Sequence, residues 1–390
     1  MARGKRVLAR LLVLSVLLLH AMIACGCAQA MEDGLAERDT DVSSALSYER
    51  SMDLQYARKF AVDYYEDGYV LLSVADGRRY LMIPEGRKQP EDLKEGIIVL
   101  RQPLTNIYLV ASAVMDMFRE LSAMDRIRFS GQKAEGWCIP EAREAMEQGK
   151  ILYAGKYNMP DYEQIVSNGC SLAIENNMIN HSPEVVEKLE DFGIPALIDL
   201  SSYEEHPLGR VEWIKLYGVL LGREEAAGKA FRKQTEMFRQ AVEKETSDKS
   251  VAFFYITTNG MANVRVGNDY VPKMITLAGG KYVFDDLGDA DSARSSVTMQ
   301  MEEFYHRTRD ADYLIYNSTI DGELSTLEEL LQKEPLLADF KAVEEKHVFC
   351  TTRDLYQQSM SLGQMIQDIH SMLSDDDKEQ KGMKFLYPLE

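Results

Sequence analysis

The sequence predicts an α/β protein with two Rossmann-like lobes joined by one long backbone helix, and a ligand cleft between the lobes. Three observations support this prediction. Short apolar runs alternate with helical stretches over residues 96–198, one long helical stretch follows, and the alternation resumes at residue 251. Strands that alternate with helices pair in parallel, which is the arrangement found in layered α/β domains.

The first 24 residues have the pattern of a secretory signal peptide. Basic side chains in residues 3–10 precede an apolar run, Leu11 to Leu19, that is shorter than the about 20 residues a membrane span needs. Cysteines follow among small residues, and the segment resembles a lipobox in which Cys25 or Cys27 takes the lipid. An ordinary cleaved signal with two incidental cysteines is the alternative. Either way we expect an extracytoplasmic protein, lipid-anchored to the cell membrane or periplasmic.

Residues 25–50 are polar and acidic without an apolar period, which predicts a flexible tether. An N-terminal lobe is expected over residues 51–222, and it begins with an antiparallel meander over residues 58–84. Asp-Gly pairs at Asp67 and Asp76 separate the alternating segments of this meander. Asp-Gly between such segments is a strong hairpin signal.

The rest of the N-terminal lobe alternates between short apolar runs and amphipathic stretches. We expect strands at residues 97–100, 126–129, 151–153, 172–174 and 195–198. We expect helices at residues 107–123, 140–148, 162–166, 183–191 and 212–221. Glycine follows the last two helices, at Gly193 and Gly222, and glycine commonly ends a helix.

The connecting helix is predicted over residues 223–247, where Ala227, Phe231 and Phe238 fall on one stripe. At 1.5 Å per residue it would be ~35 Å long, comparable to the width of a domain. The C-terminal lobe follows over residues 248–375, and residues 376–390 are predicted to be a tail. Its expected strands are 251–256, 282–284, 313–316 and 347–350. Its expected helices are 271–278, 302–308, 326–332 and a last one ending at residue 373.

Composition excludes some functions. The chain has 44 basic and 63 acidic residues, a net charge of −19, so nucleic acid would be repelled and is not an expected partner. Cys138, Cys170 and Cys350 are too sparse for a disulfide framework, although one bridge among them remains open. No Gly-x-Ser-x-Gly, Walker or Gly-x-Gly-x-x-Gly motif is present, so we expect no enzyme. A secreted hydrolase is the alternative from that class.

No metal site and no cofactor are expected. The histidines that a metal would need are dispersed and form no His-x-x-His or His-Glu-x-x-His pair. They are His181, His206, His306 and His347.

Two local motifs occupy equivalent places in the two lobes. Pro160 to Ile165 precedes a strand in the first lobe, and Met301 to Tyr305 precedes a strand in the second. With the secretion signal and the single long helix, these motifs resemble the class III (helical-backbone) substrate-binding proteins of ABC importers, which serve ferric siderophores, haem and cobalamin. The resemblance covers residues 95–373 and does not include the meander.

The resemblance implies that the protein works with an ABC permease and its ATPase, and that it is a monomer. It also implies permease docking through one surface glutamate per lobe, at Glu163 and Glu302. Exposed ion pairs contribute only ~0–1 kcal/mol each. Such pairs would therefore orient the protein on its permease without holding it tightly.

Arginines and aromatic residues follow several predicted strands at their carboxyl ends, where open α/β sheets bind ligands. Together they suit a bulky, flat anion through stacking, cation–π contact and bidentate pairing. The predicted ligand-binding residues are Asn106, Tyr108, Trp137, Arg265, Arg294, Arg353 and Tyr356. We expect an iron complex, with a ferric siderophore as the prediction and haem, cobalamin or a bare metal ion as alternatives.

Overall fold

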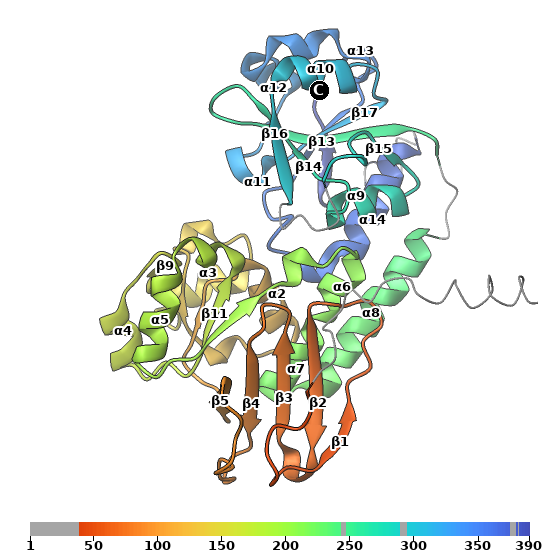
Figure 1. Ribbon diagram of the computed structural model, residues 1–390. Helices are drawn as coiled ribbons and strands as arrows, with labels where there is room; N and C mark the ends of the chain where they lie inside the picture. The colour runs from red at the N-terminus through yellow and green to blue at the C-terminus, as the bar shows by residue number, and fades with distance from the viewer. Residues whose placement is uncertain (1–38, 243–246, 289–294, 375–379, 381) are drawn as a thin grey trace, which may run out of the picture. The chain divides into compact units, whose positions relative to one another are not determined.

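The predicted α/β class is confirmed by parallel sheets with helices between their strands (Figure 1). The structure, a computed structural model, describes residues 39–242, 247–288, 295–374, 380 and 382–390. The predicted signal peptide, with Cys25 and Cys27, and the first part of the tether lie outside these residues, as does Arg294. None of the helices in the described ranges combines the length and apolar character that crossing a membrane requires.

The first sheet has the strand order β1-β2-β3-β4-β5. Its strands are β1 Tyr48–Ser51, β2 Phe60–Tyr65, β3 Val70–Val74, β4 Arg79–Ile83 and β5 Ile97–Arg101. The predicted meander is present as the antiparallel strands β2, β3 and β4, and Asp67 takes a left-handed φ of 63° in the first turn. We expected the apolar run at residues 97–100 to be the first strand of the parallel sheet, but it belongs to the first sheet. This run is β5, which pairs in parallel with β4. The prediction failed because the periodicity of an apolar run does not specify which strand it will pair with.

Both faces of this first sheet are covered. One face packs into the main core, where Phe60 lies 5.0 Å from the ring of Trp213. The other face carries a second apolar cluster that includes Tyr65 and Leu81, and Val42 from the preceding segment is buried in it. Residues 40–50 therefore belong to the fold, which corrects that part of the predicted tether.

The second sheet is entirely parallel, with the strand order β12-β11-β6-β7-β8. Its strands are β6 Ile107–Leu109, β7 Ile127–Ser130, β8 Leu152–Tyr153, β11 Ala173–Asn176 and β12 Ala196–Asp199. A short hairpin of β9 Gly155–Lys156 and β10 Met159–Pro160 follows β8. The associated helices are α2 Ser112–Glu120, α3 Pro140–Glu147, α4 Tyr162–Ser167 and α5 Pro183–Asp191.

One boundary in this sheet differs from the prediction. Residues 107–123 were expected to be a single helix, but Ile107–Leu109 forms the central strand β6 and the helix begins at Ser112. All three residues of β6 are buried. Ile107, Tyr108 and Leu109 are β-branched, aromatic and aliphatic residues, which suit a strand that is buried on both faces. Their burial in the sheet therefore prevails over the helical periodicity of the residues that follow.

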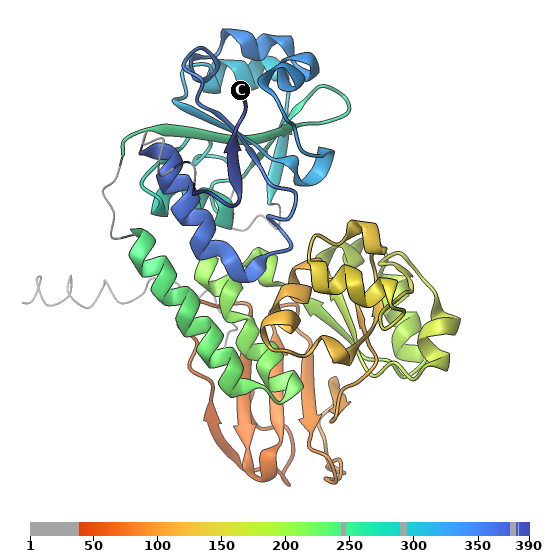
Figure 2. The ribbon, with the colours of Figure 1, turned by 180° about the vertical axis from the view of Figure 1, so that it is seen from behind.

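Three helices lead from the second sheet to the last one. They are α6 Pro207–Glu212, α7 Ile214–Leu221 and α8 Glu224–Val242. Gly222 ends α7 with a left-handed φ of 65°. Helix α8 packs against α7 and also against α14 Leu362–Leu373, and both views show it beside these two helices (Figures 1 and 2). The long helix predicted between the lobes is thus α8, and it contacts elements that precede and follow it in the chain.

The third sheet is mixed, with the order β16-β14-β13-β17-β18-β19 and β15 beside β13. Its strands are β13 Ser250–Ile256, β14 Ala262–Arg265, β15 Lys281–Tyr282, β16 Ser296–Met299, β17 Tyr313–Tyr316, β18 Val348–Thr351 and β19 Leu386–Pro388. The helices here, besides α14, are α9 Tyr270–Leu277, α10 Met301–Thr308, α11 Ser318–Asp321, α12 Leu327–Lys333 and α13 Lys341–Glu344. The antiparallel strands β14, β16 and β19 were not predicted. Because β19 pairs with β18, residues 386–388 are part of the sheet and not of a tail.

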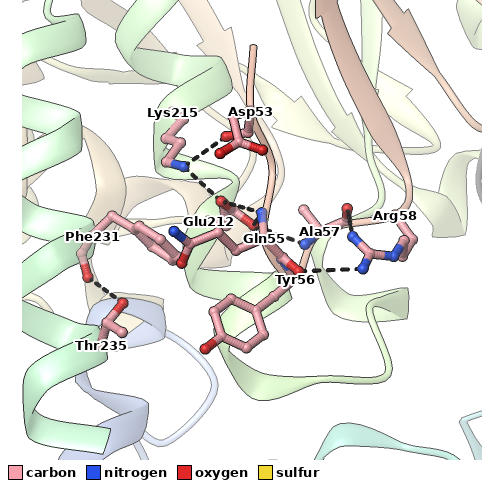
Figure 3. A network of polar contacts seen from close by, with 9 residues as sticks. All are labelled: Asp53, Gln55, Tyr56, Ala57, Arg58, Glu212, Lys215, Phe231 and Thr235. Carbon is pink, nitrogen blue, oxygen red and sulfur yellow. Dashed lines mark hydrogen bonds and ion pairs between the residues drawn. The ribbon is translucent and has the colours of Figure 1, made fainter. Parts of the chain in front are cut away.

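Two buried carboxylates, Glu212 at the end of α6 and Glu204 before that helix, bind the segment that leads into β2, and Figure 3 shows the contacts of Glu212. Glu212 accepts hydrogen bonds from the backbone N–H groups of Gln55, Tyr56 and Ala57 at 2.8–3.1 Å. Glu204 accepts from the next two backbone N–H groups, at residues 58 and 59, at 2.9–3.0 Å. These bonds to charged acceptors hold residues 55–59, the segment before β2, against α6 and the turn that precedes it.

Candidate ligand-binding site

A cavity of about 240 Å³ lies where strands of the second sheet end. Its walls follow the carboxyl ends of β6, β11 and β12, and further residues follow β14 and β18 of the third sheet. Ligands of open α/β sheets bind beyond the carboxyl ends of the strands, so this is the expected place for a site. The cavity is lined by Ala111, Ser112, Ala113, Asn176, Asn177, Met178, Asp199, Ser202, Tyr203, Arg210, Arg265, Tyr270, Ser295 and Tyr356.

Arg210 of α6 is the buried cation of this cavity. Its residue exposure is 3%, and its guanidinium carbon lies 4.5 Å from the centre of the Tyr270 ring. Its Nη2 donates to the backbone carbonyl of Tyr356 at 3.4 Å, and its Nε has no hydrogen-bond partner among the described residues. A buried charge is costly unless it is fully hydrogen-bonded. An unused donor on a buried guanidinium in a cavity therefore points to an anionic ligand.

Arg265, the last residue of β14, is the second cation. Its Nη2 donates to the hydroxyl of Tyr356, and its guanidinium carbon lies 4.9 Å from the centre of the same ring. Its Nη1 lies 3.6 Å from Oδ2 of Asp269. The backbone carbonyl of Arg265 accepts from the hydroxyl of Tyr282 at 2.8 Å, so the residue is held at both its main chain and its side chain.

Each guanidinium has a buried carboxyl group near it. Asp199, in the cavity wall, accepts from the hydroxyl groups of Ser201 and Tyr217 at 2.6 Å. Burial raises the pKa of Asp199, while those two hydrogen bonds and the charge of Arg210 act to lower it. Burial also raises the pKa of Asp269, against the lowering effect of Arg265. The hydrogen-bonding capacity of Asp199 is thus largely used by its neighbours, whereas Nε of Arg210 has no acceptor in the part of the chain that the structure describes.

Of the predicted ligand-binding residues, the structure brings Arg265 and Tyr356 together in the cavity wall. Trp137 and Tyr108 are both 0% exposed and lie in the core. The indole N–H of Trp137 donates to Ser130 Oγ at 3.0 Å, and the hydroxyl of Tyr108 donates to the carbonyl of Gly155 at 3.0 Å. Their place as cleft residues is corrected, because their rings complete the hydrophobic packing under the parallel sheet.

Two further predicted residues lie away from the cavity wall. Asn106 precedes β6, so it lies at the amino end of that strand, and its side chain donates to the carbonyl of Asn168 at 3.0 Å. Its placement depended on the misassigned strand at residues 97–100 and is corrected with it. Arg353 is exposed, and its backbone N–H donates to Glu323 at 2.8 Å.

Arg210 was not among the predicted residues. The only sequence signal is that it lies in a mainly apolar stretch from Leu208 to Leu221, and Lys215 lies in the same stretch but pairs with Glu212 and does not line the cavity. Tyr270 and Asn176 were recognisable as residues beyond strand ends, but only the folded chain shows which of many such residues meet.

Glu163 and Glu302 are both exposed, in the first turns of α4 and α10. Glu303 is exposed beside Glu302. Acidic side chains are favourable at helix N-termini, so this position alone does not require a docking role. The thiols of Cys138, Cys170 and Cys350 are free, and in the described ranges no three His, Cys, Asp or Glu side chains converge as metal ligands would.

Solved structures share this fold. A haem-binding protein, HutB of Vibrio cholerae, is 17% identical with a TM-score of 0.54, covering 67% of this chain and 96% of its own. A possible iron-binding protein of Staphylococcus epidermidis is 15% identical with a TM-score of 0.53, covering 68% of this chain and 97% of its own. A protein of an ABC-type Fe3+-hydroxamate transport system of Saccharomonospora viridis is 18% identical with a TM-score of 0.53, covering 68% and 92% of the two chains.

Curated relatives cover most of the chain. Two uncharacterised lipoproteins of Methanocaldococcus jannaschii are 25% and 26% identical over 359 and 365 residues. The first match covers 82% of this chain and 81% of the relative, and the second covers 89% and 90%. The periplasmic binding protein family profile matches residues 133–355, which include Arg210 and Arg265. The chain therefore belongs to the periplasmic binding protein family, in its class III (helical-backbone) group.

Proposed function

We propose that this protein is the extracytoplasmic substrate-binding component of an ABC importer, and that it captures an anionic iron complex, a ferric siderophore. The observation that supports this most is Arg210, buried in the cavity with an Nε that has no partner among the described residues. A binding role, not a catalytic one, accounts for such a group. Iron, haem and Fe3+-hydroxamate are named for the proteins of the three solved structures, which supports an iron complex as the ligand here.

The ligand is inferred to be anionic because two guanidinium groups line one small cavity. Carboxylate, catecholate and hydroxamate oxygens pair with a guanidinium through charge-assisted hydrogen bonds, which are roughly twice as strong as neutral ones. The rings of Tyr270 and Tyr356 lie against these guanidiniums and offer flat apolar surface beside the charge. A neutral sugar would offer Nε of Arg210 no charged acceptor, so it would satisfy this buried donor less well than an anion does.

The size of the cavity adds a condition. At about 240 Å³ it is below the ~300–1,000 Å³ that pockets for drug-sized ligands usually enclose. We therefore propose that the cavity widens when a chelate enters.

Delivery is proposed to follow from the two exposed glutamates. Glu163 and Glu302 would each meet a basic side chain of the permease, and a lipid on Cys25 or Cys27 would keep the monomeric protein at the membrane surface. The two uncharacterised relatives are named as lipoproteins, which supports the anchor.

The proposed ligand class is tested by titrating the purified protein with a panel of ferric siderophores, haem and cobalamin in a calorimeter. We expect an anionic ferric chelate to bind, and Arg210→Met to weaken that binding at least tenfold, since a hydrogen bond to a charged group contributes about 1.5–3 kcal/mol. The matched control is Arg239→Met, an exposed arginine of α8 paired with Glu236, which should leave affinity unchanged. If haem or cobalamin bound more tightly than every siderophore, that compound would be the ligand instead. If no compound of the panel bound, the proposal would be wrong.

A further inference from the structure

Tyr356 accepts hydrogen bonds from both arginines of the candidate site, Arg210 and Arg265. Its backbone carbonyl accepts from Nη2 of Arg210 at 3.4 Å, and its hydroxyl accepts from Nη2 of Arg265. The same hydroxyl accepts from the side-chain amide of Asn317 at 3.1 Å. The ring lies against the guanidinium of Arg265, 4.9 Å from its carbon to the ring centre. A residue of the protein therefore uses the donors that an anion would need.

The segment that carries Tyr356 is attached to the N-terminal half of the chain, although it follows β18 in sequence. The side chain of Gln357 donates to the carbonyl of Gly136 at 2.7 Å and accepts from the backbone N–H of Cys138 at 2.8 Å. Two more hydrogen bonds follow, from the Ser359 hydroxyl to the carbonyl of residue 113 at 2.7 Å and from the Met360 N–H to residue 116 at 2.8 Å.

Asp116, the acceptor of the last bond, is 0% exposed, and its carboxylate also lies 2.6 Å from Nη2 of Arg119. Such a buried, charge-paired acceptor makes a firm attachment point. By contrast, the hydroxyl of Tyr356 reaches across to Arg265 of β14 and to Asn317, which follows β17. Tyr356 thus bridges a segment attached to α2 and to the loop at residues 136–138 on one side, and Arg265 of β14 and Asn317 after β17 on the other.

We propose that Tyr356 competes with the ligand for Arg265, and that an incoming anion replaces the Tyr356 hydroxyl as the hydrogen-bond acceptor of this arginine. The exchange involves hydrogen bonds only: the neutral hydroxyl gives up the donor of Arg265, and an oxyanion of the ligand accepts it instead. A charged bidentate acceptor wins this exchange, whereas a neutral ligand does not. Tyr356 therefore discriminates against uncharged molecules, and its movement supplies the room that the cavity of about 240 Å³ lacks.

This inference rests on the proposed function for its ligand, but one consequence does not depend on any ligand. In Tyr356→Phe the ring and the backbone contact remain and only the hydroxyl is lost. Arg265 should then be more reactive toward phenylglyoxal, which modifies guanidinium groups, by several-fold in the ligand-free protein. Mass spectrometry of the peptide containing Arg265 measures that rate.

The binding test uses the ferric complex of 2,3-dihydroxybenzoate, an anionic catecholate chelate. Tyr356→Phe should bind it about tenfold more tightly than the wild type, since a hydrogen bond to a charged group no longer has to be displaced. The control is Tyr316→Phe, whose hydroxyl lies 3.3 Å from Asp321 outside the cavity, and which should change neither affinity nor Arg265 reactivity.

Three outcomes are informative. Weaker binding by Tyr356→Phe would show that the phenol contacts the ligand directly, and it would overturn the competitor role. Unchanged reactivity of Arg265 would overturn it as well, whatever binds. If the chelate bound neither protein while Arg265 became more reactive, the proposed ligand class would be wrong and the hold of Tyr356 on Arg265 would stand.

Discussion

Glu175, in β11, shows at the residue scale how a carboxyl group can be buried without compensation. It is 0% exposed, and neither carboxylate oxygen has a hydrogen-bond partner among the described residues. Burial raises its pKa from 4.5 to about 8. Desolvation disfavours the charged form, so the group stays protonated in the folded chain near neutral pH. It is one strand position before Asn176, which lines the cavity.

The raised pKa gives a pH-dependent stability. Between pH 4.5 and about 8 the folded chain holds a proton at Glu175 that the unfolded chain has released, so the free energy of unfolding falls as pH rises through this window and levels off above it. Glu175→Gln should therefore stabilise the protein by roughly 2–5 kcal/mol at pH 9 and by much less at pH 5. Urea unfolding at both pH values measures the difference. Glu163→Gln, an exposed control, should show no such dependence, and an equal effect at both pH values would contradict the argument.

Single-residue roles were predicted unevenly from the sequence. Arg265 and Tyr356 were named because they follow apolar runs, and both line the cavity. Trp137 was named by the same reasoning and lies in the core. Position after a strand restricts which edge of the sheet a residue approaches, but the burial of its side chain depends on neighbours that are distant in sequence.

Elements with a strong local pattern were predicted closely. The helix expected at residues 183–191 is α5 at Pro183–Asp191, where proline begins the helix and Gly193 follows its end with a left-handed φ of 75°. Strand β6 was missed because its three buried residues run directly into a helix. Strands β14 and β16 were missed because they form an antiparallel pair within a lobe where parallel alternation was expected.

The attachment of the first sheet to α6 is an element-scale property that can be tested. Glu212→Gln removes the charge that accepts three successive backbone N–H groups, at Gln55, Tyr56 and Ala57. We expect a loss of about 2–4 kcal/mol in the free energy of unfolding and faster hydrogen exchange at those amides. Glu205→Gln, an exposed neighbour of Glu204, is the control and should behave as the wild type. Unchanged exchange at residues 55–57 would refute the attachment.

At the scale of the whole molecule, α8 connects two α/β halves whose strand ends and following loops supply one cavity. This arrangement could be anticipated because it follows from the order of elements along the chain. The second, five-stranded parallel sheet and the separate sheet before it could not be divided correctly, because strand pairing depends on contacts that the order of elements does not specify.

The proposed docking on a permease is also tested at the scale of the whole molecule. If Glu163 and Glu302 orient the protein on its permease, reversing both charges in Glu163→Lys with Glu302→Lys should abolish ligand-stimulated ATPase activity of the reconstituted importer and leave ligand affinity unchanged. The control reverses two other exposed glutamates, Glu187 of α5 and Glu328 of α12, and should keep the stimulation. Loss of affinity in the double variant would mean that the two residues serve the fold or the ligand site instead.

The most direct test of the central claim is a crystal structure of the protein bound to an anionic ferric chelate from the panel. The chelate should lie in the cavity between the strand ends, with its oxygens within hydrogen-bond distance of the guanidinium groups of Arg210 and Arg265. A chelate bound at any other place, with both guanidiniums free of it, would contradict the account.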